Sequence, residues 1–270
     1  MTHSGDQKSI CFLIGAPRSG TTWLQRLLQA HPDICGGEES HFFRLFTPAI
    51  RDAGIWEADD RRNLGPLAYI DRQTYDGAIR DVWAKVFDPL YQEHPQARVH
   101  LEKTPEHALC IPQIVQLFPQ AKFVFLLRDS RAVTASLLHA SSGWGHHWAP
   151  DTARSAAATW RRYTRVALKW HKKNPDHPFH TVRYEDLLAD TPGQLDQILD
   201  FVLPEGCPKR TEEVLAAFNA ANVGEDDLSG FARKRGATGW KTDLTTWQKL
   251  VVWKETRSLM RSVGYVTRPF

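Results

Sequence analysis

The stretch GAPRSGTTW, residues 15–23, decides how the first part of this chain folds. An apolar run, residues 10–14, precedes it, and an amphipathic segment, residues 22–30, follows it. This order predicts a buried strand, a tight loop and the first turn of a helix. Backbone N–H groups at a helix N-terminus stabilise a bound phosphate or sulfate, and glycine lets the backbone approach such an anion closely. We therefore expect an anion-binding loop here. Its side-chain donors are Arg18, Ser19, Thr21 and Thr22.

The two glycines of this loop, Gly15 and Gly20, have the spacing of a Walker A loop. Thr21, however, stands where that motif carries the lysine that grips a nucleoside triphosphate. The loop therefore indicates an anion-binding site that lacks the lysine with which Walker A loops bind a nucleoside triphosphate. A P-loop kinase or NTPase is one alternative, and a plain glycine turn that caps a helix is another.

Size and composition are those of an ordinary globular protein. The chain has 270 residues, of which 42% are hydrophobic and 24% charged, so it can bury a large core. Its formal net charge of +3 is too small to indicate a nucleic-acid partner. No apolar run approaches the roughly 18 residues of a membrane span, and the polar N-terminus has no hydrophobic signal region. We therefore expect a cytoplasmic protein without a transmembrane span.

Cysteine is scattered in this chain, without a CxxC pair. This spacing indicates free thiols in a reducing compartment rather than disulfides or a zinc site. His146 and His147 are adjacent, and neighbouring side chains of an extended loop point apart, so we expect no metal site. The cysteines are Cys11, Cys35, Cys110 and Cys207.

Strands and helices alternate along the rest of the chain. This alternation predicts an α/β fold, with a single domain over residues 1–270 and a central parallel sheet flanked by helices. Thr191 is the predicted N-cap of a helix whose first residue is Pro192. Residues 35–98 are weakly patterned. Further strands are predicted at residues 97–102, 122–127 and 179–183, helices at 112–118, 131–140, 151–174 and 245–263, and loops at 141–150 and 223–239.

Three later segments place cations and aromatic rings where predicted strands end or loops begin. After the strand at 122–127 comes the sequence RDSR, in which Arg128 together with Ser136 suits a phosphomonoester. The other two segments are VRYEDL, residues 182–187, and RGATGWK, residues 235–241. Their simpler explanations are an ion pair within RDSR, a capped strand end and a solvated basic loop, respectively.

Together with the first loop, these segments resemble the sulfotransferases that use 3′-phosphoadenosine 5′-phosphosulfate (PAPS). PRSGTT, residues 17–22, resembles their 5′-phosphosulfate loop, and the run through residues 31–39 is most similar to the tyrosylprotein sulfotransferases. RGATGWK resembles a segment of the cytosolic sulfotransferases, but it lacks their aspartate before Trp240 and has Arg235 for their first lysine. The resemblance runs from residue 15 to 241, except for residues 40–98, and implies the P-loop-like sulfotransferase fold.

The resemblance also implies how the donor nucleotide is bound. The first loop contacts the 5′-phosphosulfate, RDSR with Ser136 contacts the 3′-phosphate, and the tyrosine of YEDL approaches the adenosine. The product would be 3′,5′-adenosine bisphosphate (PAP), and no metal is implied. The nucleotide-binding residues implied are Arg18, Ser19, Gly20, Thr21, Thr22, Trp23, Arg128, Ser136, Tyr184, Lys234, Arg235 and Gly236.

Catalysis of sulfuryl transfer needs a base for the proton of the acceptor and cations for the charge on the leaving phosphate. The resemblance assigns the cations to Arg18 and Lys103. Similarity to the tyrosylprotein enzymes places Glu39 as the base. His107 is the rival, because the cytosolic enzymes use a histidine two residues nearer to the lysine, and His41 is a third choice.

The sequence thus predicts an enzyme, a PAPS-dependent sulfotransferase that moves a sulfuryl group to a hydroxyl or an amine. A P-loop kinase or NTPase and a non-catalytic nucleotide-binding protein of the same fold are the alternatives. Ten tryptophans favour a small aromatic or lipophilic acceptor, with a peptide as the other option. Trp144 and Trp148 are candidates for an acceptor wall, or they are simply packed on the surface.

Overall fold

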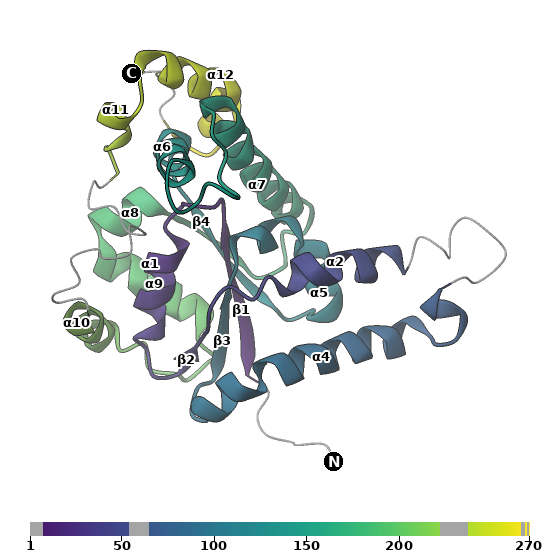
Figure 1. The fold of residues 1–270 in the computed structure, drawn as a ribbon. Helices are drawn as coiled ribbons and strands as arrows, with labels where there is room; N and C mark the ends of the chain where they lie inside the picture. Colours follow the sequence, from purple (N-terminus) through teal and green to yellow (C-terminus); the bar gives the residue numbers. More distant parts are fainter. Residues whose placement is uncertain (1–7, 54–64, 222–236, 266–267, 269) are drawn as a thin grey trace.

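β1 (Ser9–Gly15) is the central strand of a five-stranded parallel sheet with the order β2-β3-β1-β4-β5 (Figure 1). The computed structural model describes residues 8–53, 65–221, 237–265, 268 and 270. The other strands are β2 (Ile34–Cys35), β3 (Val99–Lys103), β4 (Lys122–Leu127) and β5 (Phe179–Arg183).

Helices cover both faces of this sheet (Figure 1). On one face are α1 (Thr21–Gln29), α8 (Tyr184–Ala189), α9 (Thr191–Val202) and α10 (Thr211–Ala221). On the other are α2 (Phe42–Asp52), α4 (Arg72–Glu93), α5 (Ile111–Leu117), α6 (Ser130–Ser141) and α7 (Ala153–Lys173). The remaining elements are η1 (Pro66–Ala68), η2 (Pro105–Leu109), α11 (Trp240–Asp243) and α12 (Thr246–Ser262).

The central strands β1 and β4 are buried on both sides because apolar side chains occupy every position of their middle parts. In β1, Phe12 and Ile14 point into the core beneath α7, whereas Cys11 and Leu13 point into the core beneath α1. Alternation with a period of two residues places successive side chains on opposite faces. The continuous apolar runs that predicted β1 and β4 therefore contribute side chains to two separate hydrophobic cores, one on each face of the sheet.

The predicted α/β fold with a parallel sheet is confirmed, and most predicted elements lie within two residues of their expected bounds. The N-cap prediction at Thr191 is wrong by one residue. Asp190 is the N-cap, since its carboxylate accepts a hydrogen bond from the N–H of Gly193. Thr191 instead starts the helix, and Pro192 is its second residue.

α4 was not expected in the weakly patterned segment before β3. Its buried face consists of Asp76, Ile79, Trp83 and Phe87, at helical spacing. Exposed Val82 and Val86, with Pro89 inside the helix, blur this stripe in the sequence. Asp71, which caps the helix through the N–H of Thr74, was the signal that could have located its start.

All four cysteines carry free thiols, as predicted, and three of them are buried. In the described part of the chain, no helix combines the length and the apolar character that crossing a membrane requires.

The carboxyl ends of the parallel strands meet at one edge of the sheet. The predicted anion-binding loop follows β1 there, Lys103 ends β3, Arg128 follows β4, and Tyr184 follows β5. Ligands of open α/β sheets bind at this edge, because loops from several strands converge on it. The topology therefore gathers the predicted residues of four distant segments into one place.

Candidate active site

The loop after β1 is held in a shape that few residues other than glycine allow. Gly20 has φ of 100° and precedes the first residue of α1. A Cβ atom on Gly20 would lie 2.6 Å from Cε2 of Tyr184, so the ring of Tyr184 packs directly against the loop backbone. Arg18 also adopts a left-handed conformation, with φ of 70°. The strain at Arg18 is typical of a backbone shaped for ligand binding.

Several unsatisfied groups of this edge fit an anionic ligand. Within the described residues, the buried Ser19 Oγ and Arg128 Nε have no hydrogen-bond partner. The first turn of α1 carries no acidic residue, so its N–H groups and positive dipole end are not compensated by a carboxylate there. An orphaned buried donor costs free energy unless a ligand satisfies it. These residues therefore fit a phosphate or sulfate group.

Arg18 and Arg128 approach each other from the first loop and from the end of β4. Arg128 Nη1 donates to the carbonyl oxygen of Arg18 at 3.2 Å, and its guanidinium lies 4.1 Å from the ring centre of Tyr184. Arg18 Nε donates to Ser136 Oγ at 3.1 Å. The two predicted phosphate sites thus touch, although more than 100 residues separate Arg18 from Arg128 and Ser136.

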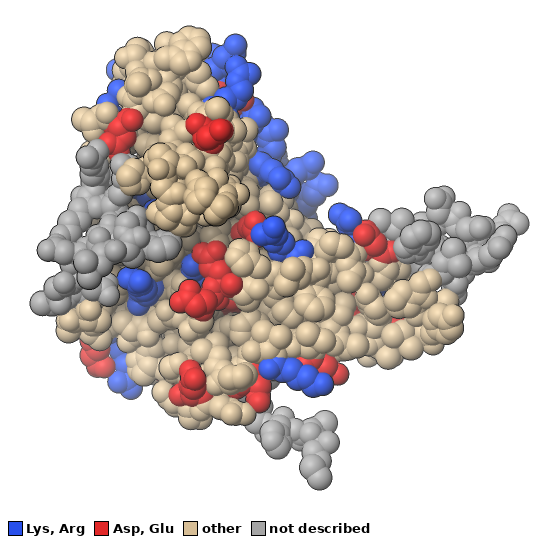
Figure 2. Space-filling model, in the orientation of Figure 1, with Lys and Arg blue, Asp and Glu red and all other residues tan. Residues whose placement is uncertain are grey.

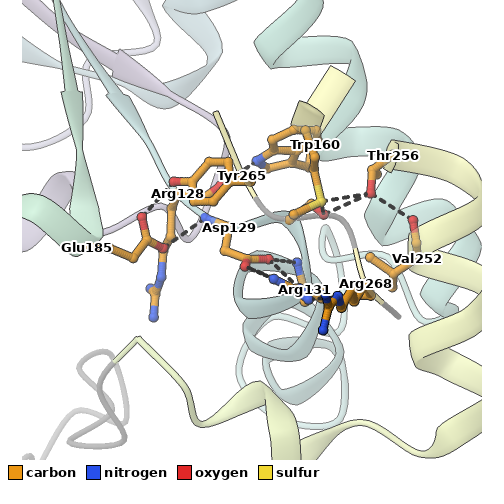
Figure 3. Close-up of polar contacts among 11 residues, drawn as sticks. Arg128, Asp129, Arg131, Trp160, Glu185, Val252, Thr256, Tyr265 and Arg268 are labelled. Atoms are coloured by element: carbon orange, nitrogen blue, oxygen red, sulfur yellow. Dashed lines mark hydrogen bonds and ion pairs between the residues drawn. The ribbon is translucent and has the colours of Figure 1, made fainter. Parts of the chain in front are cut away.

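The backbone that carries Arg128 is fixed by side chains from two other elements, α7 and α8 (Figure 3). Trp160 Nε1 donates to the Arg128 carbonyl at 2.8 Å, and Glu185 Oε1 accepts from the N–H of Asp129 at 3.0 Å. Asp129 pairs with Arg131 at 2.6 Å. The predicted local ion pair of RDSR therefore exists, but Arg128 lies outside it and points over Tyr184.

Glu39 and Lys103 form an ion pair at the same edge of the sheet. Lys103 Nζ lies 2.5 Å from Glu39 Oε1 and donates to Thr22 Oγ1 at 3.4 Å. Lys103 is only 4% exposed, whereas about a third of the Glu39 side chain is exposed. The pair therefore joins a buried cation beside α1 to a carboxylate that is partly exposed to solvent.

A buried polar network behind Glu39 holds its segment in place. Ser40 Oγ and Thr104 Oγ1 donate to Glu102 Oε1 at 2.9 Å and 2.6 Å. His107 is completely buried, and its Nε2 accepts from the N–H of Phe43 at 3.3 Å. Its Nδ1 faces Glu102 Oε1 at 3.4 Å. These contacts anchor the chain at Ser40 and Phe43, on both sides of His41, which lies two residues after Glu39.

Burial sets the protonation of this network. It lowers the pKa of His107 to about 3, so the ring is neutral, and it raises the pKa of Glu102. A neutral imidazole that accepts at Nε2 carries its proton on Nδ1, toward Glu102. His107 therefore acts here as an acceptor for backbone, away from solvent.

His41 connects Glu39 to a second carboxylate. Its Nδ1 lies 2.9 Å from Glu106 Oε2, and its Nε2 lies 3.8 Å from Glu39 Oε2. Arg44 lies 3.7 Å from the same Glu106 oxygen. His41 has φ of 51°, which is uncommon for a residue with a side chain.

Aromatic rings flank the loop on two sides. Trp23 packs edge-to-face on Tyr184, with ring centres 6.4 Å apart. Trp144 lies over the guanidinium of Arg18 at 5.2 Å and next to Trp148 at 5.3 Å. The tryptophan pair thus stands beside the loop that follows β1, and its two residues are 40% and 48% exposed.

Part of the predicted C-terminal segment lies outside the described residues, namely Lys234, Arg235 and Gly236. Trp240 is described and nearly buried, with the guanidinium of Arg131 3.9 Å above its ring. The end of RGATGWK therefore packs against the helix that follows Arg128.

The profile of the Sulfotransferase family matches residues 11–203, which include the loop, Glu39, Lys103, Arg128 and Tyr184. This chain belongs to the sulfotransferase family. The match covers more than half of the chain and contains the sheet edge described above.

Curated relatives in this family come from animals and bacteria. A putative protein-tyrosine sulfotransferase of Caenorhabditis briggsae is 29% identical over 197 residues, which are 72% of this chain and 65% of the relative. The nodulation protein NoeE of Sinorhizobium fredii is 36% identical over 142 residues, half of this chain and 32% of that protein. The chain thus spans between a third and two thirds of these relatives.

Solved sulfotransferase structures share the fold. The sulfotransferase domain of the Synechococcus PCC 7002 olefin synthase superposes with a TM-score of 0.60 and 18% identity, over 99% of this chain and 100% of that domain. Mouse sulfotransferase SULT7A1, complexed with PAP, superposes with a TM-score of 0.55 and 15% identity, over 96% of this chain and 87% of its own. The resemblance to sulfotransferases and the expected fold are confirmed.

Several residues that build the site were not predicted from the sequence. Trp160, Glu185 and Tyr265 hold the Arg128 segment, and Glu102 holds the Glu39 segment. Glu185 lies inside the VRYEDL motif, so the motif contained a signal for it. The other three carry no local pattern that distinguishes them from core residues.

Proposed function

We propose that this protein transfers a sulfuryl group from PAPS to a hydroxyl or amine of an acceptor, with Glu39 as the base. The observation that carries the proposal is the Lys103–Glu39 pair, which lies against Thr22 of the phosphate loop. This ion pair places a cation for the transferred sulfuryl group next to a base for the acceptor.

The donor is bound by the two ends of the site. Ser19 Oγ, the N–H groups of α1 and Arg18 hold the 5′-phosphosulfate, and the free Nε of Arg128 with Ser136 holds the 3′-phosphate. Trp23 and Tyr184 offer an aromatic corner for the adenine. Lys234, Arg235 and Gly236 are proposed as further contacts.

Transfer follows from the same geometry. Lys103 and Arg18 stabilise the negative charge that develops on the leaving phosphate oxygen. Glu39 takes the acceptor proton as the new bond to sulfur forms. His107 is buried and accepts from Phe43, so we assign it to positioning the Glu39 segment, and we keep Glu39 as the base.

The acceptor approaches from the exposed side of Glu39. Trp144 and Trp148 beside Arg18 favour a ring-bearing small acceptor that stacks on them, and the similarity to protein-tyrosine sulfotransferases makes a tyrosine-containing peptide the second candidate. The whole domain, residues 1–270, is proposed as one catalytic unit.

A ligand comparison tests the donor first. We expect PAP to raise the melting temperature more than ATP with magnesium does, because a ligand that binds only the folded state stabilises it in proportion to ln(1 + [L]/Kd). A greater stabilisation by ATP with magnesium would instead support a kinase or NTPase.

Transfer is then measured with labelled PAPS over phenols, sugars, tyrosine peptides and a metabolite extract. Label on any acceptor supports the enzyme. Tight PAP binding without transfer to any acceptor would mean a non-catalytic nucleotide-binding protein.

A further inference from the structure

Cations gather on two packed helices away from the candidate site. α7 carries seven Lys or Arg residues and no carboxylate, and α12 carries four with one carboxylate, Glu255. Eleven cations against one carboxylate give these helices a formal charge of +10, whereas the whole chain has +3. The rest of the chain, with 23 cations and 30 carboxylates, therefore has a net charge of −7.

The two helices form one continuous surface. Arg161 Nη1 lies 3.1 Å from Glu255 Oε2 and donates to the Glu255 carbonyl at 3.2 Å. Arg154 lies 3.9 Å from the same carboxylate. The single carboxylate of the pair of helices is thus used at their seam, and it does not neutralise the outward face.

Eight exposed cations make up this outward face, which we call the basic face. Within the described part of the chain, no carboxylate lies within ion-pair distance of any of them. Figure 2 shows Lys and Arg along the edge of the molecule where Figure 1 places α7 and α12. The basic face consists of Arg162, Arg165, Lys169, Lys172, Lys173, Lys254, Arg257 and Arg261.

A tryptophan lies on the same side of α12 as these cations. Trp247 is 73% exposed, and Lys254 and Arg261 follow it at intervals of seven residues. Seven residues are nearly two helical turns, so the three side chains share one side of the helix. An exposed tryptophan beside lysine and arginine is typical of segments that sit in the headgroup region of a bilayer.

We propose that the basic face docks this protein onto an anionic lipid bilayer. A bilayer is flat, so cations spread over two helices reach its headgroups together, and Trp247 supplies the apolar contact. An RNA strand is the competing polyanion. Non-specific binding of single strands relies on a groove lined by stacking rings, whereas the basic face has its cations on the outside of two helices and one exposed tryptophan. The proposal does not depend on the sulfuryl transfer proposed above.

Vesicle sedimentation tests this docking. The full chain is mixed with phosphatidylcholine vesicles and with equimolar phosphatidylcholine–phosphatidylglycerol vesicles over a range of salt. We expect binding only to the anionic vesicles, weakening as salt rises. Trp247→Ser should weaken this binding several-fold without changing the preference for anionic lipid.

Charge reversal locates the surface. The triple variant Arg165→Glu, Lys169→Glu, Lys172→Glu should lower the vesicle partition coefficient by at least about 100-fold, because each cation near an anionic leaflet contributes about a factor of five. The matched control is Arg51→Glu, Arg80→Glu, Lys85→Glu on α2 and α4, which changes the net charge equally and should retain most of the binding.

The proposal is wrong if the protein binds neutral and anionic vesicles equally, or if it does not bind anionic vesicles. It is also wrong if the control triple variant loses as much vesicle binding as the basic-face triple variant. RNA binding that the basic-face triple variant abolishes, without any vesicle binding, would overturn it in favour of RNA. If the triple variant fails to fold in a thermal melt, the salt series and Trp247→Ser decide the matter on the folded protein.

Discussion

At the scale of the residue, the site depends on side chains whose neighbours leave them little freedom. Gly20 cannot carry a side chain because the ring of Tyr184 lies where its Cβ would be. Lys103 is buried against Thr22 and Glu39, and its contacts with these two side chains fix the position of its ammonium group. Such fixed positions spare the reorganisation that transfer would otherwise require.

Glu39 gives the sharpest test at this scale. We expect Glu39→Gln to lower kcat by at least about 100-fold, because an amide cannot take the acceptor proton, while PAP affinity stays unchanged. The measurements are labelled-PAPS transfer, with an acceptor from the screen, and calorimetric titration with PAP.

Glu38→Gln is the matched control, because Glu38 is the exposed neighbour of Glu39 and should tolerate the change. Near-normal turnover of Glu39→Gln would remove Glu39 from the base position and leave the partly exposed His41 beside it as the candidate.

At the scale of the element, the carboxyl end of β5 organises the part of the site that carries Arg128. Glu185, just after β5, accepts from the N–H of Asp129 at the start of α6 and from the hydroxyl of Tyr265 at 2.6 Å (Figure 3). Burial and the nearby Glu185 carboxylate raise the pKa of Tyr265, so its phenol stays protonated and donates. One carboxylate thus joins the strand end, α6 and the segment that follows α12.

Removal of this link should affect stability and nucleotide binding together. Glu185→Ala leaves the Asp129 N–H and the Tyr265 hydroxyl without this partner, and we expect a loss of about 2 kcal/mol in the free energy of unfolding. PAP affinity should fall as well, because Asp129 positions Arg128. Urea unfolding and PAP titration measure the two effects.

Asp186→Ala is the control for this experiment. Asp186 is 54% exposed and lies 3.8 Å from Arg183, so its loss should change stability by less than about 1 kcal/mol. An effect equal to that of Glu185→Ala would contradict the role assigned to Glu185.

At the scale of the whole molecule, the sheet buries two neutral histidines in its core. His100 in β3 and His107 in η2 are fully buried, and burial lowers the pKa of each from 6.5 to about 3. The unfolded chain therefore binds protons at these rings at pH values where the folded protein does not.

This difference predicts a loss of stability in acid. As pH falls below about 6.5 toward 3, the free energy of unfolding should decrease by about 1.4 kcal/mol per pH unit for each histidine. Glu102 has a raised pKa and works in the opposite direction above its ordinary value of 4.5, so it offsets part of this loss there.

Urea unfolding at several pH values measures the slope. We expect His107→Gln to reduce the slope of the free energy of unfolding against pH by the contribution of one histidine, about 1.4 kcal/mol per pH unit. His147→Gln, at an exposed position, should leave this slope unchanged. An unchanged slope in His107→Gln would contradict a buried, neutral His107.

The sheet, the strand–loop–helix unit of β1 and α1, and the strand-end positions of Arg128 and Tyr184 could be predicted from the sequence alone. These features depend on runs of neighbouring residues, such as the apolar strands and the glycines on either side of Arg18. Such residues influence only the backbone close to them in the sequence. The family could be predicted from the same motifs, and the match of the Sulfotransferase family profile to residues 11–203 confirms it.

Only the tertiary structure decided which of these residues meet and which are hidden. The pairing of Glu39 with Lys103, the burial of His107 and the basic face of α7 and α12 join residues tens of positions apart. Such contacts depend on how the helices pack on the two faces of the sheet. Because the packing energy is shared among many side chains, no local sequence pattern predicts these contacts.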